Sequence, residues 1–223
     1  MQYRHEMKYE INAADMTVLR QRLRAVTRLD SNAVDGRYAI RSLYFDNLYD
    51  KALMEKMNGL NRREKFRIRY YNGDLSVLNL EKKTKINGLS CKQKEIVTAE
   101  EAGALLHGDI GWMHDSGRPL VQELYLKMIN QGLRPKTIVD YTREAYTYAP
   151  GNVRVTMDYG IRTGMNGLDF LNPACVTVPV GEEYIILEIK WDAFLPDIVR
   201  DAVLLGNRRK QAFSKYAASR VYM

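Results

Sequence analysis

Several segments of the chain alternate between charged and apolar residues, and this period of two is typical of β-strands whose faces differ in polarity. The segment from Tyr3 to Ile11 places four charged residues on one face and mainly apolar residues on the other. The charged face can point to solvent above an apolar core, or it can line the polar interior of a barrel. The same alternation predicts strands at Tyr38–Asp46, Phe66–Tyr71, Leu75–Lys85, Lys136–Tyr148, Val153–Tyr159 and Tyr184–Trp191.

Helices are predicted where apolar residues recur three and four positions apart. Asn12 is placed to cap a helix over Ala13–Thr27, and Thr98 with Glu101 forms a capping box at the start of Thr98–Leu106. Strands and helices do not alternate regularly, and no linker or repeat divides residues 1–223, so we expect one α+β domain with a mostly antiparallel sheet. The other predicted helices are Leu48–Asn58, Leu120–Gln131, Phe194–Leu205 and Arg208–Arg220.

The net charge of the protein is concentrated in one predicted hairpin. The segment from Arg62 to Lys94 holds ten Lys or Arg residues and three acidic ones, an excess of seven, and the whole protein carries a formal charge of +7. Like charges on one sheet face repel each other unless carboxylates or a bound anion lie between them. Because guanidinium groups match phosphate oxygens, the segment predicts a phosphate-binding surface; a solvated basic face is the alternative.

The turn of this hairpin decides which side chains share the face of Arg67 and Arg69. Asn72-Gly73-Asp74 is a turn signal. A two-residue loop pairs Tyr71 with Asp74 and places Lys82 beside the two arginines, whereas a three-residue loop pairs Tyr71 with Leu75. A slip of one residue moves every side chain to the other face. We favour the three-residue loop, which brings Glu81 and Lys83 to the arginines and keeps leucines away from them.

Composition narrows the class of protein. The chain of 223 residues is 46% hydrophobic and 27% charged, which is ordinary for a globular domain. It contains no phosphate-binding loop or dinucleotide motif, and its two cysteines and three histidines show no metal-site spacing. No apolar run is long enough to cross a bilayer, and the charged N-terminus is unlike a signal peptide, so we expect a cytoplasmic protein.

Nine short motifs follow one another along the chain. They are Glu6-x-Lys8-x-Glu10, Arg41 before Leu-Tyr-Phe-Asp, Arg67-x-Arg69, Glu81-x-Lys83, a lysine within Lys92–Lys94, Tyr141-x-Arg143, Arg154-x-x-x-Asp158, Glu188-x-Lys190 and Ser214-Lys215-Tyr216. Taken in order, they resemble the triphosphate tunnel metalloenzymes, and most of all the polyphosphate polymerase domain of the vacuolar transporter chaperone (VTC) family. This resemblance covers nearly the whole chain, and it implies a closed, mostly antiparallel eight-stranded β-barrel with surrounding helices and a basic tunnel inside.

The resemblance also implies roles for individual residues. Glu188 is expected to hold a divalent cofactor, Mn²⁺ or Mg²⁺, and Glu81 and Asp158 either assist the metal or orient arginines. Lys92 and Lys94 are alternatives for one tunnel position, and we choose Lys94. The residues expected to bind substrate phosphates are Lys8, Arg41, Arg67, Arg69, Lys83, Lys94, Arg143, Arg154 and Lys215. Those expected to act in catalysis are Lys8, Arg67, Arg69, Lys83 and Lys215.

The expected reaction is transfer of a phosphoryl group from ATP, or another triphosphate, to inorganic polyphosphate. The family's tunnel hydrolases open with Glu-x-Glu-x-Lys, whereas this chain has Glu6-Met7-Lys8-Tyr9-Glu10, which favours the polymerase branch over a triphosphatase. A non-catalytic module that binds polyphosphate or inositol phosphates is a further alternative. RNA or other nucleic acid is disfavoured because acidic residues interleave with the basic strands. A separate membrane protein is a possible partner.

Overall fold

One antiparallel sheet dominates the computed structural model, which describes residues 3–31, 33–181, 184–206 and 208–220. The main path of the sheet is β1-β10-β8-β7-β3-β4-β5-β6, with β2 paired to β7 and β9 paired to β8. The expected α+β class with an antiparallel sheet is therefore confirmed. The strands are β1 (His5–Ile11), β2 (Arg28–Leu29), β3 (Arg37–Asp46), β4 (Arg62–Tyr71), β5 (Asp74–Ile86), β6 (Leu89–Val97), β7 (Arg134–Tyr148), β8 (Val153–Gly164), β9 (Thr177–Pro179) and β10 (Ile185–Trp191).

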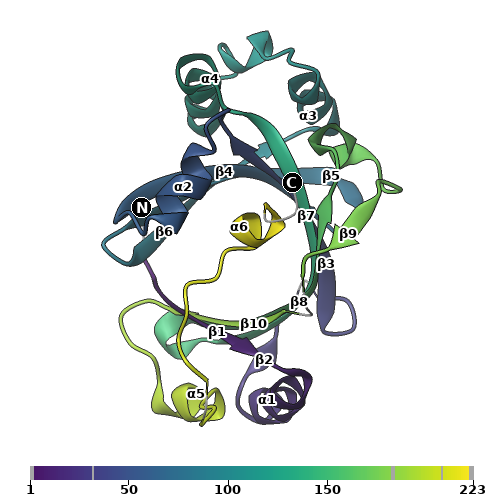
Figure 1. The fold of residues 1–223 in the computed structure, drawn as a ribbon. Coiled ribbons are helices and arrows are strands. Elements are labelled where there is room, and N and C mark those ends of the chain that lie inside the picture. Colours follow the sequence, from purple (N-terminus) through teal and green to yellow (C-terminus); the bar gives the residue numbers. More distant parts are fainter. Residues whose placement is uncertain (1–2, 32, 182–183, 207, 221–223) are drawn as a thin grey trace.

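The sheet curls into a ring, which brings its two edge strands, β1 and β6, to the same side of the molecule (Figure 1). Within the described residues, an isolated bridge joins these edges: the amide of Arg4 donates to the carbonyl of Ser90 at 3.0 Å, and the amide of Ser90 donates back at 3.1 Å. No ladder of paired residues joins β1 to β6 there. The expected closed barrel is therefore not confirmed, although eight strands do form the main path.

Capping explains where two of the helices begin. The side chain of Asn12 accepts from the amide of Asp15, whose carboxylate accepts from the amide of Asn12, and Thr98 and Glu101 form the same capping box. The predicted N-cap at Asn12 and the predicted capping box at Thr98 are both confirmed, and Asn12 also belongs to a capping box. The α-helices are α1 (Ala13–Val26), α2 (Lys51–Met57), α3 (Ala99–Leu106), α4 (Pro119–Gln131), α5 (Asp197–Ala202) and α6 (Lys215–Ser219), and the 3₁₀ turns are Gly111–Met113, Pro150–Asn152 and Gly167–Leu171.

The two helices predicted at the end of the chain are wrong over most of their length. Only Asp197–Ala202 and Lys215–Ser219 are helical. Residues 208–214 run beside β1 in an extended form: Lys210 forms a bridge with Tyr9, and the amide of Gln211 donates to the carbonyl of Lys8 at 3.0 Å. These backbone groups are satisfied by a strand rather than by a helical turn, so the apolar spacing of the segment did not decide its structure.

The apolar faces of the strands point outward, under the helices. Leu43, Phe45 and Phe66 belong to a core that includes apolar residues of α3 and α4, while Leu187 and Ile189 of β10 pack with residues of α1 and α5. Figure 1 shows these helices outside the ring, whereas α6 lies within it. Because the outer faces are taken by the cores, the charged faces of the strands surround the interior. Of the two orientations left open by the sequence, the polar interior is the one observed.

The charged hairpin places the predicted side chains on one face, although its turn differs from the predicted one. Tyr71 pairs with Asp74 across a two-residue turn, so the favoured three-residue loop is wrong. A shift in register between Arg69 and Tyr71 then places Arg67 opposite Glu81. Such a bulge changes which residues share a face, so the prediction that Glu81 and Lys83 accompany the arginines is still confirmed. Lys82 lies on the outer face, 3.2 Å from Glu64, and also contacts Glu123 of α4.

Candidate functional site

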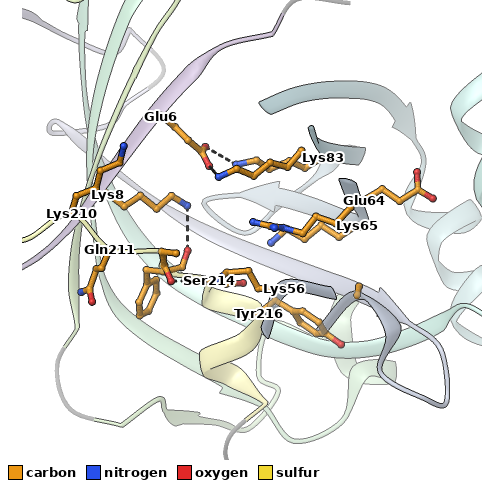
Figure 2. Close-up of a pocket in the computed structure, with 15 residues that line it drawn as sticks. Glu6, Lys8, Lys56, Glu64, Lys65, Lys83, Lys210, Gln211, Ser214 and Tyr216 are labelled. Carbon is orange, nitrogen blue, oxygen red and sulfur yellow. Dashed lines mark hydrogen bonds and ion pairs between the residues drawn. The ribbon is translucent and has the colours of Figure 1, made fainter. Parts of the chain in front are cut away.

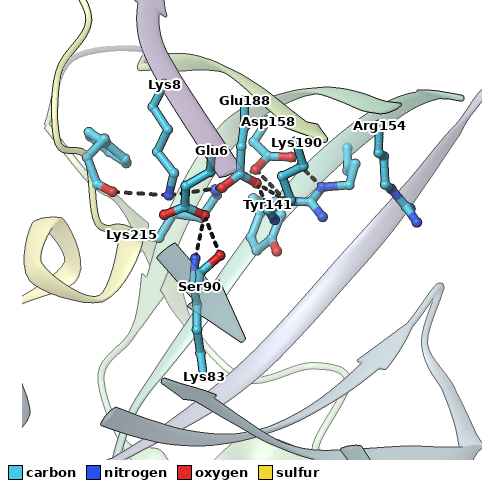
Figure 3. A network of polar contacts seen from close by, with 12 residues as sticks. Glu6, Lys8, Lys83, Ser90, Tyr141, Arg154, Asp158, Glu188, Lys190 and Lys215 are labelled. Atoms are coloured by element: carbon cyan, nitrogen blue, oxygen red, sulfur yellow. Dashed lines mark hydrogen bonds and ion pairs between the residues drawn. The ribbon is translucent and has the colours of Figure 1, made fainter. Parts of the chain in front are cut away.

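Two connected cavities lie inside the ring of strands, and they share Lys8, Lys65, Lys83, Phe213 and Ser214 in their walls. We call the larger, of about 380 Å³, the inner chamber, and the other, of about 340 Å³, the vestibule. The vestibule is drawn in Figure 2, and part of the polar network of the inner chamber in Figure 3. The basic residues that line the inner chamber are Arg4, Lys8, Lys65, Arg67, Arg69, Lys83, Lys92, Arg143, Arg154, Lys190 and Lys215.

Glu81 organises the basic residues on one side of the inner chamber. Its carboxylate is almost fully buried and lies 2.6 Å from a terminal nitrogen of Arg67, 3.1 Å from Lys92 and 3.8 Å from Arg69. Burial alone would raise the pKa of Glu81, but Arg69, Arg67 and Lys92 outweigh it and hold the pKa well below its usual range. The carboxylate is therefore charged at neutral pH and fixes the two guanidinium groups in place.

Asp158, on β8, holds basic residues in place in the same way as Glu81. Its carboxylate accepts two bonds from Arg143, at 2.6 and 2.7 Å, and also contacts the ammonium of Lys215. Although burial opposes ionisation, Arg143 and Lys215 lower the pKa of this fully buried side chain. A two-pronged arginine–carboxylate pair has a defined geometry, so Arg143 is held in one orientation before any ligand binds.

Glu188 lies where several positive side chains converge (Figure 3). It is 3.1 Å from Lys8, 2.9 Å from Lys190 and 4.0 Å from Arg143. Burial opposes its ionisation, yet Lys190, Lys8, Lys83 and Arg143 lower the pKa of Glu188 well below its usual range.

A second carboxylate, Glu6, extends the cluster of charged side chains around Glu188 toward the vestibule. It is 2.7 Å from Lys83 and 3.7 Å from Lys85. Burial would raise its pKa, but Lys83 and Lys8 together lower the pKa of Glu6 to about 2, against the opposing effect of Glu188. Glu6 and Glu188 are therefore two ionised carboxylates that influence each other within a basic surrounding.

Lys65, at the junction of the two cavities, has no carboxylate within ion-pair distance among the described residues. Its ammonium lies 5.0 Å from the centre of the Tyr44 ring. Burial, reinforced by Arg67, Lys83 and Lys8, lowers the pKa of Lys65 to about 7, although Tyr44 acts in the opposite direction. Lys65 is thus a cation that a bound anion would stabilise.

Two further polar atoms in the wall of the inner chamber lack a hydrogen-bond partner among the described residues. They are the hydroxyl of Thr156, whose side chain is buried, and Nε of Arg154. Arg154 does use a terminal nitrogen, which donates to Tyr38 at 2.6 Å and pairs with Asp30. Buried polar atoms are usually satisfied, so these two mark a place where a polar ligand is expected to bind.

The sequence of residues 3–223 matches the family model described as the VTC domain. The chain belongs to the VTC domain family. The resemblance inferred from its short motifs is therefore confirmed. Among curated proteins, none matches the chain significantly.

Solved structures with a similar arrangement are distant in sequence. A putative adenylate cyclase from Bacillus halodurans is 13% identical, with a TM-score of 0.49 over 85% of this chain and 80% of that one. A protein from Pyrococcus horikoshii is 15% identical, with a TM-score of 0.44 over 90% of this chain and 84% of that one.

Most of the residues expected to bind phosphates line the inner chamber of this VTC domain. The exceptions are Arg41 and Lys94. Arg41 forms a two-pronged pair with Asp140, at 2.8 and 2.9 Å, in a separate shallow cavity of the outer face. It shares that face with Leu43 and Phe45, which are buried under the helices, so its expected place in the tunnel is wrong. Those that line the chamber as expected are Lys8, Arg67, Arg69, Lys83, Arg143, Arg154 and Lys215.

The choice of Lys94 over Lys92 is also corrected. Lys92 lines the inner chamber and contacts Glu81, whereas Lys94, two residues further along the same strand, is absent from its wall. Three lining residues that we had not chosen as site residues are Lys65, Thr156 and Lys190. The alternation of the strands contained a signal for Lys65, which shares a face with Arg67 and Arg69.

Metal binding depends on how many carboxylates the site can offer. Within the described residues, no group of three or more His, Cys, Asp or Glu side chains is placed to hold a metal. Mg²⁺ is, however, commonly bound by one or two carboxylates together with substrate phosphates. Glu188 and Glu6 fit that limited role, because they contact lysines and are not fixed in close arginine pairs as Glu81 and Asp158 are.

No helix in the described residues has the length and apolarity needed to span a bilayer.

Proposed function

We propose that this VTC domain transfers the terminal phosphoryl group of ATP to a growing chain of inorganic polyphosphate. The observation that carries the proposal is the inner chamber, where Arg67, Arg69 and Arg143 are oriented by buried carboxylates. Phosphoryl transfer requires mainly positioning and neutralisation of charge, and preorganised guanidinium groups supply both. Lys8, Lys83 and Lys215 add positive charge around the same space.

The reaction balances without a proton acceptor on the protein. The bond between the terminal phosphorus of ATP and its bridging oxygen breaks, a bond forms to a terminal oxygen of the polyphosphate chain, and ADP leaves. The acceptor oxygen is already anionic, so the task of the protein is to bring two anions together in line. We expect the arginines to hold the triphosphate and the lysines to reduce the repulsion between donor and acceptor.

A divalent cation, Mn²⁺ or Mg²⁺, would be held by Glu188, with Glu6 as the second carboxylate and phosphate oxygens as the other ligands. When bound, such an ion supplies additional neutralisation of the phosphate charge. Lys8 and Lys190 contact the carboxylate of Glu188 and keep it ionised, ready to bind the cation.

Hydrolysis of a triphosphate in the same chamber is the second candidate function. It requires a group that takes a proton from water, and Lys65 favours this candidate because a pKa of about 7 leaves part of the population as the free amine. A third candidate is a module that binds polyphosphate or inositol phosphates without turnover, since the same cations would serve for binding alone.

The test is incubation of the pure protein with γ-labelled ATP and Mn²⁺, with the products resolved on a gel. We expect a ladder of labelled polyphosphate. Labelled phosphate alone would replace the proposal by hydrolysis, and no labelled product would replace it by the binding module. Lys83→Gln should greatly reduce the product, while Lys82→Gln is the matched control because its side chain lies on the outer face of the same strand.

A further inference from the structure

The vestibule carries positive charge that the protein itself does not neutralise. Within the described residues, the side chains of Lys56 and Arg63 donate hydrogen bonds only to the backbone carbonyls of Ala212 and Leu60, at 3.4 and 2.5 Å. Lys210 has no ion pair within the described residues. The lining comprises seven basic and two acidic residues: Lys8, Lys56, Arg63, Lys65, Lys83, Lys85 and Lys210, with Glu6 and Glu64.

The two acidic residues neutralise little of this charge. Glu64 pairs with Lys82, at 3.2 Å, and with Lys127 of α4, both outside the ring of strands. Glu6 pairs with Lys83, at 2.7 Å, at the boundary with the inner chamber, and more distantly with Lys85, at 3.7 Å. Neither acidic residue forms an ion pair with Lys56, Arg63 or Lys210 within the described residues. The pKa of Lys56 is lowered first by burial and further by the like charges of Arg63, Lys8 and Lys85, so the cations at this wall repel each other.

The types of basic residue differ between the cavities. In the inner chamber, arginines held by carboxylates offer fixed, forked donors. In the vestibule, six of the seven cations are lysines. Three of them, Lys56, Lys65 and Lys210, have no carboxylate partner within the described residues, so they attract anions but impose little orientation. A surface of this kind suits a repeating polyanion that must move past it, whereas the inner chamber suits phosphates that must be held for reaction.

We propose that the vestibule is a separate binding site for the distal part of a linear polyphosphate chain, whose end occupies the inner chamber. This inference rests on the proposed function, because it names the position of the polymer in the same tunnel. The two cavities share Lys8, Lys65 and Lys83 in their walls, so one continuous chain of phosphates can contact both. A triphosphate fills the inner chamber and leaves the vestibule free.

The consequence is an affinity that depends on chain length. Long-chain polyphosphate engages Lys56, Arg63 and Lys210 in addition to the inner chamber, whereas tripolyphosphate does not. Removal of two of these cations should therefore weaken binding of the long chain by about tenfold or more, and leave the affinity for tripolyphosphate nearly unchanged. Because the vestibule is open to solvent, the additional affinity should decrease as the salt concentration rises.

The experiment measures dissociation constants for tripolyphosphate and for long-chain polyphosphate, without ATP or metal, at fixed ionic strength. The variant is Lys56→Gln/Arg63→Gln, and the matched control is Arg24→Gln/Arg28→Gln, which removes two exposed charges that line neither cavity. We expect a selective loss for the long chain in the first variant only. Lys210→Gln should produce a smaller loss in the same direction and serves as an independent variant.

Three results would overturn the inference: equal losses for both ligands, no loss for either, or an equal loss in the control. The measurement involves no turnover, so it can fail while labelled ATP still yields a ladder of polyphosphate. Conversely, a selective loss of long-chain affinity in a protein that makes no polyphosphate would uphold the binding site and remove the proposed reaction.

Discussion

The two cavities of the tunnel differ in how the protein treats its own positive charge. In the inner chamber, Glu81 and Asp158 lie behind the basic residues and fix their positions, while Glu188 lines the chamber and contacts Lys8 and Lys190. In the part of the vestibule that is not shared, Lys56 and Arg63 have no carboxylate partner within the described residues. The inner chamber is therefore preorganised for a defined group, while the vestibule attracts anions without defining their orientation.

Both arrangements of charge cost free energy, but for different reasons. Buried ion pairs lose hydration, and breaking one by removal of a single partner leaves an uncompensated charge. Unpaired cations near each other repel, and that repulsion is relieved only when an anion binds. The inner chamber should thus be sensitive to mutation in the free protein, and the vestibule should be sensitive mainly in the complex with a ligand.

The largest effect is expected for Arg143→Met, which leaves the buried Asp158 with only Lys215. We expect a loss of about 3–5 kcal/mol in the free energy of unfolding, measured by urea denaturation. Lys56→Met in the vestibule should change it by less than about 0.5 kcal/mol. The double variant Arg143→Met/Asp158→Asn should recover much of the loss, and failure to do so would show that the pair does not account for it.

Glu188→Gln should have the next largest effect, on activity rather than on stability. Loss of the carboxylate removes the expected metal ligand, and several kcal/mol of stabilisation correspond to a decrease in rate of roughly 100-fold or more. Without metal, the same variant should bind tripolyphosphate more tightly, because a negative charge has left the chamber. Unchanged Mn²⁺-dependent activity would refute the role of Glu188.

The dependence of binding on pH tests Lys65, which lies at the junction of the cavities. Its lowered pKa of about 7 means that the ammonium is present below pH 7 and is lost as the pH rises through that value. Affinity for tripolyphosphate should therefore decrease above pH 7, by up to about tenfold per pH unit for this one proton. Lys65→Arg keeps its charge and should flatten the profile; an identical slope in that variant would exclude Lys65.

Thr156→Val should give the smallest effects, with opposite signs in the free protein and the complex. The buried hydroxyl has no partner among the described residues, so its removal should raise the free energy of unfolding by about 1 kcal/mol. Affinity for tripolyphosphate should decrease several-fold, since a hydrogen bond to a phosphate oxygen is worth roughly 1 kcal/mol. A stabilised variant with undiminished affinity would show that no phosphate reaches Thr156.

Much of the fold could be predicted from periodicity, because the alternating pattern of the strands is kept in the structure. The apolar residues of each pattern pack in the cores on the outer face of the sheet. The same pattern placed Arg41 with Leu43 and Phe45, and the burial of those two residues explains why Arg41 lies outside the tunnel. The family motif had suggested the opposite. For Arg41, the alternation of the strand indicated the correct face, and the resemblance to the family did not.

Features that depend on distant contacts were not predictable in this way. The two-residue turn would by itself have placed Lys82 beside the arginines, and the bulge before Tyr71 restores the predicted face. Neither the turn nor the bulge can be predicted from local residue spacing. The extended course of residues 208–214 is set by hydrogen bonds to β1, which is about two hundred residues away in sequence. The vestibule arises from the packing of that segment near α2 and β4, so Lys56 and Lys210 could not be grouped from the sequence alone.

The most direct test of the account is a crystal structure of the protein with bound tripolyphosphate. The account predicts that the phosphates lie in the inner chamber, within hydrogen-bond distance of Arg67, Arg69 and Arg143, with the hydroxyl of Thr156 facing a phosphate oxygen. Tripolyphosphate found only on the outer surface, for example beside Arg41, with the inner chamber free of phosphate, would contradict the assignment of the tunnel as the binding site.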